Sequence, residues 1–250
     1  MPRSGSHRAK PARPQLNRRP VVARRLSREA RAFPVVGIGA SAGGLDAFKN
    51  LMDALPANSG MAFILVQHLD PTHESMMVEL LAGHTAMAVR QATEGMALER
   101  DHIYVIPPGT YLAVESGALR LSRPQARHGA RLPFDFLLHS LAEACGVRAI
   151  AVILSGTGAD GSLGLKAVKN KGGLVIVQEP DEAGYDGMPL SAIATGAVDL
   201  VLPVAEIPDA LVKHARGATL AGGEGPSGAP SRSAWLGGDD RRSAPRKDRS

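Results

Sequence analysis

Cysteine and long apolar runs are what this sequence has least of. Cys145 is the single cysteine in the chain, so no internal disulfide can form, which excludes a disulfide-stapled secreted scaffold. No run of about 18 apolar residues occurs, and no apolar h-region follows the basic N-terminus, so we expect neither membrane insertion nor export. The composition predicts a cytoplasmic protein in which Cys145 is a buried structural thiol.

Acidic residues are scarce at the N-terminus, and the excess of positive charge lies in the two ends of the chain. Residues 1–33 contain ten Arg or Lys and one acid, and residues 222–250 contain six basic and four acidic residues. Subtracting +9 and +2 from the net charge of +5 leaves −6 for the middle. The basic excess therefore does not indicate a specific nucleic-acid surface on a folded domain.

Arg, Pro, Ser and Gly dominate the two ends, which carry too little apolar surface to offset the entropy of ordering. We predict a disordered basic leader over 1–33 and a disordered Gly/Ser/Arg-rich tail over 218–250. Between them, residues 34–217 are predicted to form one domain, because a chain with 44% hydrophobic residues can bury a sizeable core.

Continuous apolar runs alternate with segments of helical spacing along this middle part. Runs without polar alternation are typical of parallel strands buried on both faces. The predicted strands are 35–39, 62–67, 149–154, 174–178 and 200–202. The predicted helices are 44–55, 75–82, 133–145, 161–171, 189–194 and 204–215. This order predicts an α/β fold with a doubly wound, mainly parallel sheet and helices on both faces.

The stretch from 89 to 121 breaks this alternation. Short apolar runs at 103–106, 111–114 and 119–121 are separated by turn sequences rich in Pro and Gly. We expect these three runs to be antiparallel strands, which form a β-hairpin excursion from the parallel sheet.

Three of the predicted strands are followed by residues that can form one hydrolytic site. Ser41 follows the first strand, His68 the second, and Asp160 the strand that ends near 154. In open α/β sheets the reacting groups gather beyond the carboxyl ends of the strands. A serine nucleophile, an imidazole base and an orienting carboxylate are what acyl transfer needs.

The glycines around Ser41 allow a second interpretation. Gly37, Gly39 and Gly43 loosely match a dinucleotide fingerprint, in which backbone N–H groups at a helix N-terminus hold a pyrophosphate. The spacing is one residue too long, and no acidic residue ends the second strand. A turn that exposes the Ser41 hydroxyl needs the same small residues, and it is the interpretation we favour.

Asp160 also has a simpler interpretation, as the N-cap of the helix predicted to begin at 161. The three glycines around it exceed what a cap requires and favour a site. Metal binding is disfavoured, because His68, Asp70 and His73 are interrupted by Pro71 and no further carboxylate cluster accompanies them. We expect no cofactor and no metal.

Five motifs in the same order resemble the catalytic domain of chemotaxis protein-glutamate methylesterases of the CheB type. They are Ile-Gly-Ala-Ser-Ala-Gly-Gly, Val-Gln-His-Leu-Asp-Pro, Val-Ile-Pro-Pro-Gly, Leu-Ser-Gly-Thr-Gly-Ala-Asp-Gly and Tyr-Asp-Gly-Met-Pro-Leu-Ser-Ala-Ile. The resemblance implies a serine hydrolase that cleaves glutamate γ-methyl esters on methyl-accepting chemoreceptors and releases methanol. It also implies deamidation of receptor glutamines and a role in signal transduction.

By this resemblance the triad is Ser41, His68 and Asp160. The residues expected to supply oxyanion donors or to line the substrate site are Ala42, Thr157, Gly158, Tyr185 and Met188. Tyr185 and Met188 could equally shape only the turn before the helix at 189. The remaining alternative for the whole chain is a non-catalytic module that binds an anion or a nucleotide.

Two departures from the family pattern bear on regulation. Residues 1–33 are too short for the phospho-receiver domain that commonly precedes the catalytic domain, so phosphorylation in cis is not expected. Thr157 stands where the family commonly has Met, a form that resembles domains fused to methyltransferase and sensor modules. A methyltransferase or sensor protein is therefore an expected partner.

Overall fold

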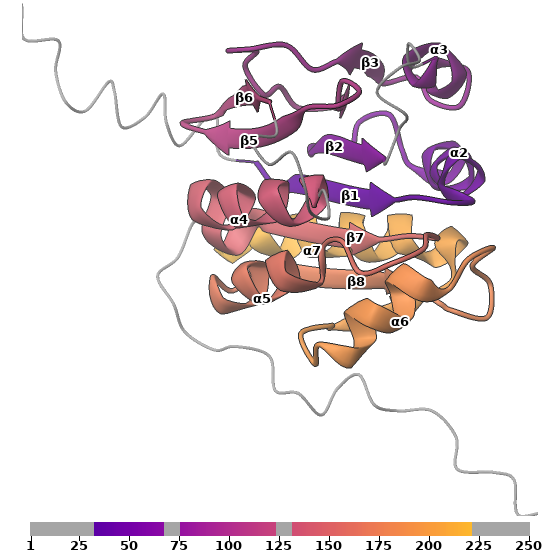
Figure 1. Ribbon diagram of the computed structural model, residues 1–250. Coiled ribbons are helices and arrows are strands. Elements are labelled where there is room, and N and C mark those ends of the chain that lie inside the picture. The colour runs from indigo at the N-terminus through magenta and orange to yellow at the C-terminus, as the bar shows by residue number, and fades with distance from the viewer. Residues whose placement is uncertain (1–32, 68–75, 124–131, 222–250) are drawn as a thin grey trace, which may run out of the picture.

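The computed structural model describes residues 33–67, 76–123 and 132–221. Within these ranges a seven-stranded parallel sheet in the order β3-β4-β2-β1-β7-β8-β9 forms the centre of the molecule (Figure 1). The strands are β1 Val35–Ala40, β2 Ala62–Gln67, β3 Ala88–Gln91, β4 His102–Val105, β7 Ala149–Ile153, β8 Leu174–Gln178 and β9 Leu200–Leu202. The predicted fold class is confirmed.

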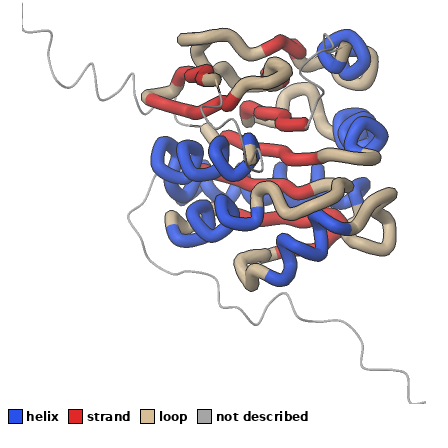
Figure 2. The backbone as a smooth tube through the Cα atoms, viewed as in Figure 1, coloured by secondary structure: helices blue, strands red, loops and turns tan. Residues whose placement is uncertain are grey.

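Helices cover both faces of this sheet (Figure 2). The helices are α2 Gly44–Ala54, α3 Met77–Ala82, α4 Pro133–Cys145, α5 Ser162–Asn170, α6 Gly187–Ala194 and α7 Ile207–Ala221. One apolar cluster contains residues of α4, α5 and α6, and a second contains residues of α2, α3 and α7. Alternate residues of β1 enter the two clusters, as a strand buried on both faces requires.

Two short helical turns complete the described elements, η1 Gly146–Arg148 and η2 Val204–Glu206. Cys145, the last residue of α4, is buried as predicted, and burial raises the pKa of its thiol. Helix α7 continues to Ala221, whereas composition placed the start of the tail at 218. None of the helices within the described ranges combines the length and apolar character needed to cross a bilayer.

The hairpin excursion consists of two strands rather than three. Strands β5 Tyr111–Glu115 and β6 Ala118–Ser122 pair antiparallel and contribute Leu112, Val114 and Leu119 to the cluster under α4. The prediction that 103–106 is antiparallel was wrong, because β4 pairs parallel with β2 and β3 inside the main sheet. Strand β3, at the edge of the sheet, was not predicted, since its mainly exposed residues carry no apolar run.

The strand order places a topological switch at the centre of the sheet. The chain moves outward from β1 to β2 on one side, then returns to β7 on the other side and continues to β8. Connections that diverge from neighbouring strands leave a crevice beyond their carboxyl ends, where α/β proteins hold their ligands. The sequence segments proposed for the site follow β1, β2 and β7, which are adjacent strands.

Candidate active site

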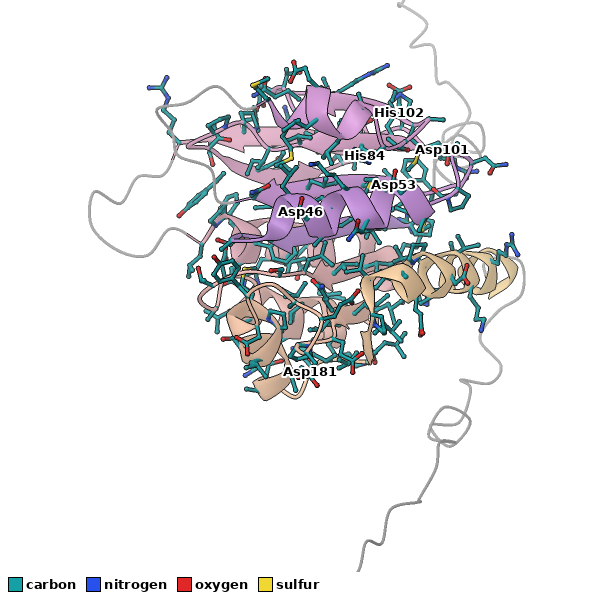
Figure 3. The ribbon with its side chains drawn as sticks, turned by 90° about the vertical axis from the view of Figure 1, so that its right-hand side faces the viewer. Asp46, Asp53, His84, Asp101, His102 and Asp181 are labelled. Carbon is teal, nitrogen blue, oxygen red and sulfur yellow. The ribbon has the colours of Figure 1, made fainter. Side chains whose placement is uncertain are left out.

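The predicted site residues follow the carboxyl ends of the adjacent strands β2, β1 and β7. Figure 3 views the molecule from this edge of the sheet and labels Asp46 of α2 and, lower in the view, Asp181 of the loop before α6. Ala40, the last residue of β1, pairs with Gln67, the last residue of β2. Ser41 and His68 therefore each follow directly after one member of a matched pair. His68 itself lies outside the described residues, as do Asp70 and His73, so the structure does not describe its contacts.

Ser41 occupies the turn between β1 and helix α2. The turn is closed by a hydrogen bond from the Gly44 N–H to the Ser41 carbonyl oxygen at 2.9 Å, and Ser41 itself is half-buried. Gly43 precedes the helix with a φ of 71°, a left-handed conformation that glycine adopts without strain. No side chain of the described part of the chain caps the amino end of α2. Because the serine turn directly precedes this helix, the positive end of the helix dipole lies at the turn.

Ser155, one per cent exposed, ties this turn to the loop after β7. Its carbonyl oxygen accepts the Ser41 N–H at 3.0 Å, and its hydroxyl donates to the Ala42 carbonyl oxygen at 2.9 Å. The same hydroxyl oxygen accepts the Tyr185 N–H at 3.0 Å, and the Ser155 N–H donates to Gln178 Oε1 at 2.8 Å. One buried side chain thus links three separate segments around the serine.

The loop before α6 closes against the same point. The Gly156 N–H donates to the Tyr185 carbonyl oxygen at 2.9 Å, and the Met188 N–H donates to the Gly156 carbonyl oxygen at 2.8 Å. A Cβ atom at Gly156 would lie 2.3 Å from Met188 Sδ and 3.0 Å from Ser41 Cβ. A side chain at position 156 would displace Met188 and crowd Ser41, so glycine lets the two loops meet beside the serine.

The residues predicted to line the site differ in exposure. Met188 is buried against Gly156, whereas Tyr185 is 52% exposed. Thr157 and Gly158 are exposed on the loop after β7, where the Gly158 carbonyl oxygen accepts the hydroxyl of Ser191 on α6 at 3.0 Å. The exposed residues Tyr185, Thr157 and Gly158 are accessible to a large substrate. Met188 is buried and packs against Gly156 of the loop after β7.

Asp160 is buried, with 4% of its surface exposed, and its carboxylate caps the amino end of helix α4. Its two oxygens accept the N–H groups of Phe134 and Asp135, both at 2.9 Å. Helix α4 has no side-chain cap of its own in the described chain, and its first residue is Pro133, which lacks an N–H. Because the Phe136 N–H already donates to Leu132, Asp160 accepts the two remaining amide groups of the first turn.

The alternative to a catalytic role was that Asp160 caps the helix that follows it, α5. Asp160 does accept helix N–H groups, but they belong to the first turn of α4, about 25 residues earlier in the sequence. An ionised carboxylate has about four acceptor positions, so the two bonds to α4 are compatible with a further bond to an imidazole.

A second buried carboxyl, Asp135, lies beside Asp160 and was not predicted. Its Oδ1 accepts the Gly164 N–H of α5 at 2.7 Å, and the residue is 5% exposed. Burial raises the pKa of the Asp135 carboxyl, the Gly164 N–H opposes this, and the negative charge of Asp160 raises it further. The backbone N–H groups of Gly161 and Leu163 also lower the pKa of Asp135. Two buried carboxyls, Asp135 and Asp160, therefore lie next to each other at the start of α4 and α5.

The glycines of β1 have a structural explanation that needs no nucleotide. A Cβ atom at Gly39 would lie 2.3 Å from the Phe134 ring, and one at Gly37 would lie 3.3 Å from Leu138. Both residues of α4 pack directly on the strand, so the glycines allow close approach of the helix. This observation removes the main support for the nucleotide-binding alternative.

Comparison with known proteins agrees with this geometry. The family model described as CheB methylesterase matches residues 36–211, more than half of the chain. The chain belongs to the CheB methylesterase family. The crystal structure of the Thermotoga maritima CheB methylesterase catalytic domain is similar, with a TM-score of 0.68 and 31% sequence identity over 72% of this chain and 98% of that one.

Two curated relatives show how much of a longer protein the chain corresponds to. A Rhodobacter capsulatus protein described as an uncharacterized 104.1 kDa protein is 44% identical over 157 residues, which are 61% of this chain and 16% of that protein. A protein-glutamate methylesterase/protein-glutamine glutaminase of Bordetella parapertussis is 37% identical over 190 residues, 73% of this chain and 53% of that protein. The chain thus spans about half the length of the named methylesterases.

Sequence reasoning missed three polar residues that lie around the candidate site. Ser155 and Gln178 stand at the ends of buried strands and bond to each other, and Asp135 stands in the first turn of α4. A polar residue at the end of an apolar run is the signal that could have identified the first two. Asp135 was hidden because an acid in the first turn of a helix is ordinary. Within the described ranges, no three His, Cys, Asp or Glu side chains come together in a way that could hold a metal ion.

Proposed function

We propose that this CheB-family domain hydrolyses glutamate γ-methyl esters on methyl-accepting chemoreceptors or similar methylated proteins. The observation that carries the proposal is the bonding of the Ser41 turn to the loop that leads to Asp160, at the switch point of a CheB-type sheet. The expected compartment is the cytoplasm, where the signalling helices of such receptors lie.

In the proposed mechanism, Ser41 Oγ attacks the ester carbonyl carbon while His68 accepts the hydroxyl proton. The tetrahedral intermediate collapses, methanol leaves with the proton returned by His68, and the glutamyl group stays on Ser41. Water then attacks this acyl-enzyme with the same assistance and releases the glutamate carboxyl group. Asp160 orients the imidazole and stabilises its protonated form. The role of His68 rests on the family resemblance and on its place directly after Gln67.

The oxyanion of the tetrahedral intermediate requires N–H donors close to Ser41. The backbone N–H of Ala42, at the positive end of α2, is the first candidate. The backbone N–H groups of Thr157 and Gly158, on the exposed loop after β7, are the second. If a glutamine side chain occupies the ester position, the same steps release ammonia, which is the glutaminase activity that the relatives' names state.

The exposure of residues near Ser41 supports a protein substrate. Tyr185 and Thr157 are exposed next to the serine turn, which suits a side chain that projects from a folded protein substrate. Because the Gly-Thr-Gly form around Thr157 resembles domains fused to methyltransferase and sensor modules, a methyltransferase or sensor partner that presents or regulates the substrate is also proposed. The boundaries at 34 and 217 and the disorder of the flanking segments stay predictions.

The test measures methanol release from a methylated receptor fragment, with and without a methyltransferase-sensor partner. The wild-type chain is expected to release methanol, and Ser41→Ala is expected to release none while it unfolds at an unchanged temperature, because Ser41 is half-buried and its backbone bonds are kept. A fluorophosphonate, which labels activated serines, should label the wild type at Ser41 and fail to label Ser41→Ala.

The outcome against the proposal is equally concrete. A folded Ser41→Ala protein that still releases methanol would refute the nucleophile assignment. Thermal stabilisation by a nucleotide, together with no labelling of the wild type, would favour the binding-module alternative instead.

A further inference from the structure

Two buried carboxyls join the amino ends of α4 and α5 in both directions. Asp160 stands just before α5 and accepts N–H groups from the first turn of α4. Asp135 stands in the first turn of α4 and accepts the Gly164 N–H from the first turn of α5. Each side chain thus caps the helix to which the other is attached.

The two helices are also in close contact at this point. A Cβ atom at Gly164 would lie 2.5 Å from Leu138 Cβ and 3.1 Å from the Asp135 carbonyl oxygen. Only Gly161 separates Asp160 from the first residue of α5. A displacement of α5 away from α4 would therefore move the backbone of Asp160 relative to the amides that hold its carboxylate.

Asp135 has two opposed electrostatic neighbours. Burial and the negative charge of Asp160 raise the pKa of its carboxyl, and the backbone N–H groups of Gly164, Gly161 and Leu163, all at the start of α5, lower it. The carboxyl therefore bonds to the first turn of α5 while it lies close to the carboxylate of Asp160. A buried acid in this place, beside a proposed triad member, is a candidate for a role in the site.

We propose that Asp135 is a positioning residue for Asp160. By holding the first turn of α5 against α4, it keeps the Asp160 carboxylate in the orientation that the catalytic base requires. The inference rests on the proposed function, in which Asp160 orients His68. A displacement of about 1 Å in such an arrangement can lower a rate by about a hundredfold, so even partial loosening should be measurable.

The test compares Asp135→Ala and Asp135→Asn in the full chain. Asp135→Ala removes the acceptor of the Gly164 N–H, and we expect kcat for methanol release to fall about tenfold while KM changes less than about twofold. Asn keeps an acceptor oxygen at the same place, so Asp135→Asn is expected to stay within about threefold of the wild-type kcat. In Asp135→Ala the amides of residues 134 and 135, which donate to Asp160, should also exchange with solvent faster.

Ser140→Ala is the matched control. Ser140 is on the same helix, about 8 Å further along its axis, and its hydroxyl oxygen accepts the Val114 N–H of β5 at 3.0 Å. This variant loses a comparable bond between elements without touching Asp160. A kcat for Asp135→Ala no lower than that of Ser140→Ala, or an effect confined to KM, would overturn the inference.

Two further measurements keep the outcome decisive. If Asp135→Ala does not fold, Asp135→Ser takes its place, because a serine hydroxyl is too short to reach the Gly164 N–H; a wild-type kcat in this variant would overturn the inference. If the wild-type chain releases no methanol, the proposed function has failed. Amide exchange then decides alone: faster exchange at 134 and 135 supports the positioning role, and unchanged exchange refutes it.

Discussion

Replacement of Asp160 by asparagine tests two roles of one side chain at once. In the structure both carboxylate oxygens accept backbone N–H groups, from Phe134 and Asp135, at 2.9 Å. The asparagine oxygen can replace one of these acceptors. Its NH₂ group then faces the other backbone N–H, so two donors meet in a buried site.

The magnitude follows from these two bonds. A hydrogen bond to a charged group contributes about 1.5–3 kcal/mol, and a buried donor left unsatisfied costs about 1–3 kcal/mol. We expect Asp160→Asn to lower the free energy of unfolding by about 2–3 kcal/mol. For a domain of this size, that loss corresponds to a decrease in Tm of about 4–12 °C. If Asp160 also orients the base, kcat should fall by about 10⁴ in protein that remains folded.

Thermal unfolding and methanol release, measured on the same preparation, separate the two effects. The control is Asp199→Asn, since Asp199 accepts the Val175 N–H at 3.0 Å at the opposite edge of the sheet and pairs with Lys169. This control should lose stability and keep kcat. An unchanged Tm in Asp160→Asn would refute the capping of α4, and a kcat equal to that of Asp199→Asn would refute the orienting role.

Three other substitutions test the packing and electrostatics around the site. Gly39→Ala should lower the free energy of unfolding by about 1–3 kcal/mol or more, because its Cβ would overlap the Phe134 ring. Gly217→Ala is the control, because a Cβ there enters open space and should not lower stability. Equal denaturation midpoints for the two variants would contradict the packing argument. Ser155→Ala removes the hydroxyl that links three segments, so denaturation should show a loss of about 1–3 kcal/mol and kcat should also fall, whereas full activity would show that the link is dispensable. Burial raises the pKa of Asp135 above its unfolded value. Protonation of this carboxyl therefore stabilises the folded chain below about pH 4, and that stabilisation is lost as the pH rises through the folded pKa. Asp135→Asn should gain stability relative to the wild type between pH 4 and pH 7, and urea midpoints that show the opposite trend would contradict this sign.

Local sequence signals were sufficient for most of the elements. The apolar runs predicted β2, β8 and β9 with the observed bounds. Strands β2 and β8 are largely buried, and burial on both faces needs continuous apolar residues. Pro133 and the helical spacing after it predicted α4 with its observed bounds, since proline favours the first turn of a helix. Strand direction was not available in this way. The residues of β4 precede a Pro-Pro-Gly turn typical of hairpins, yet they pair parallel with β2, some 40 residues earlier.

The candidate site likewise has one part that the sequence predicted and one part that it did not. The motif positions of Ser41 and Asp160 could be predicted, because both follow buried strands and the five motifs resemble one family. The partners of Asp160 could not, because its carboxylate caps a helix that begins 27 residues before it. Contacts of this kind depend on how two helices pack. A local sequence pattern therefore cannot predict which backbone N–H group a distant side chain will bond to.

The sequence by itself determined the order of most strands and helices, though not edge strand β3, and the polar positions that end buried strands, since apolar periodicity and turn residues act locally. Tertiary structure alone decided that Gly39 lies against Phe134, that Ser155 joins three loops, and that Asp135 and Asp160 cap each other's helices. Close packing is the physical reason: which groups meet in a dense interior depends on the simultaneous fit of segments that are far apart in the chain.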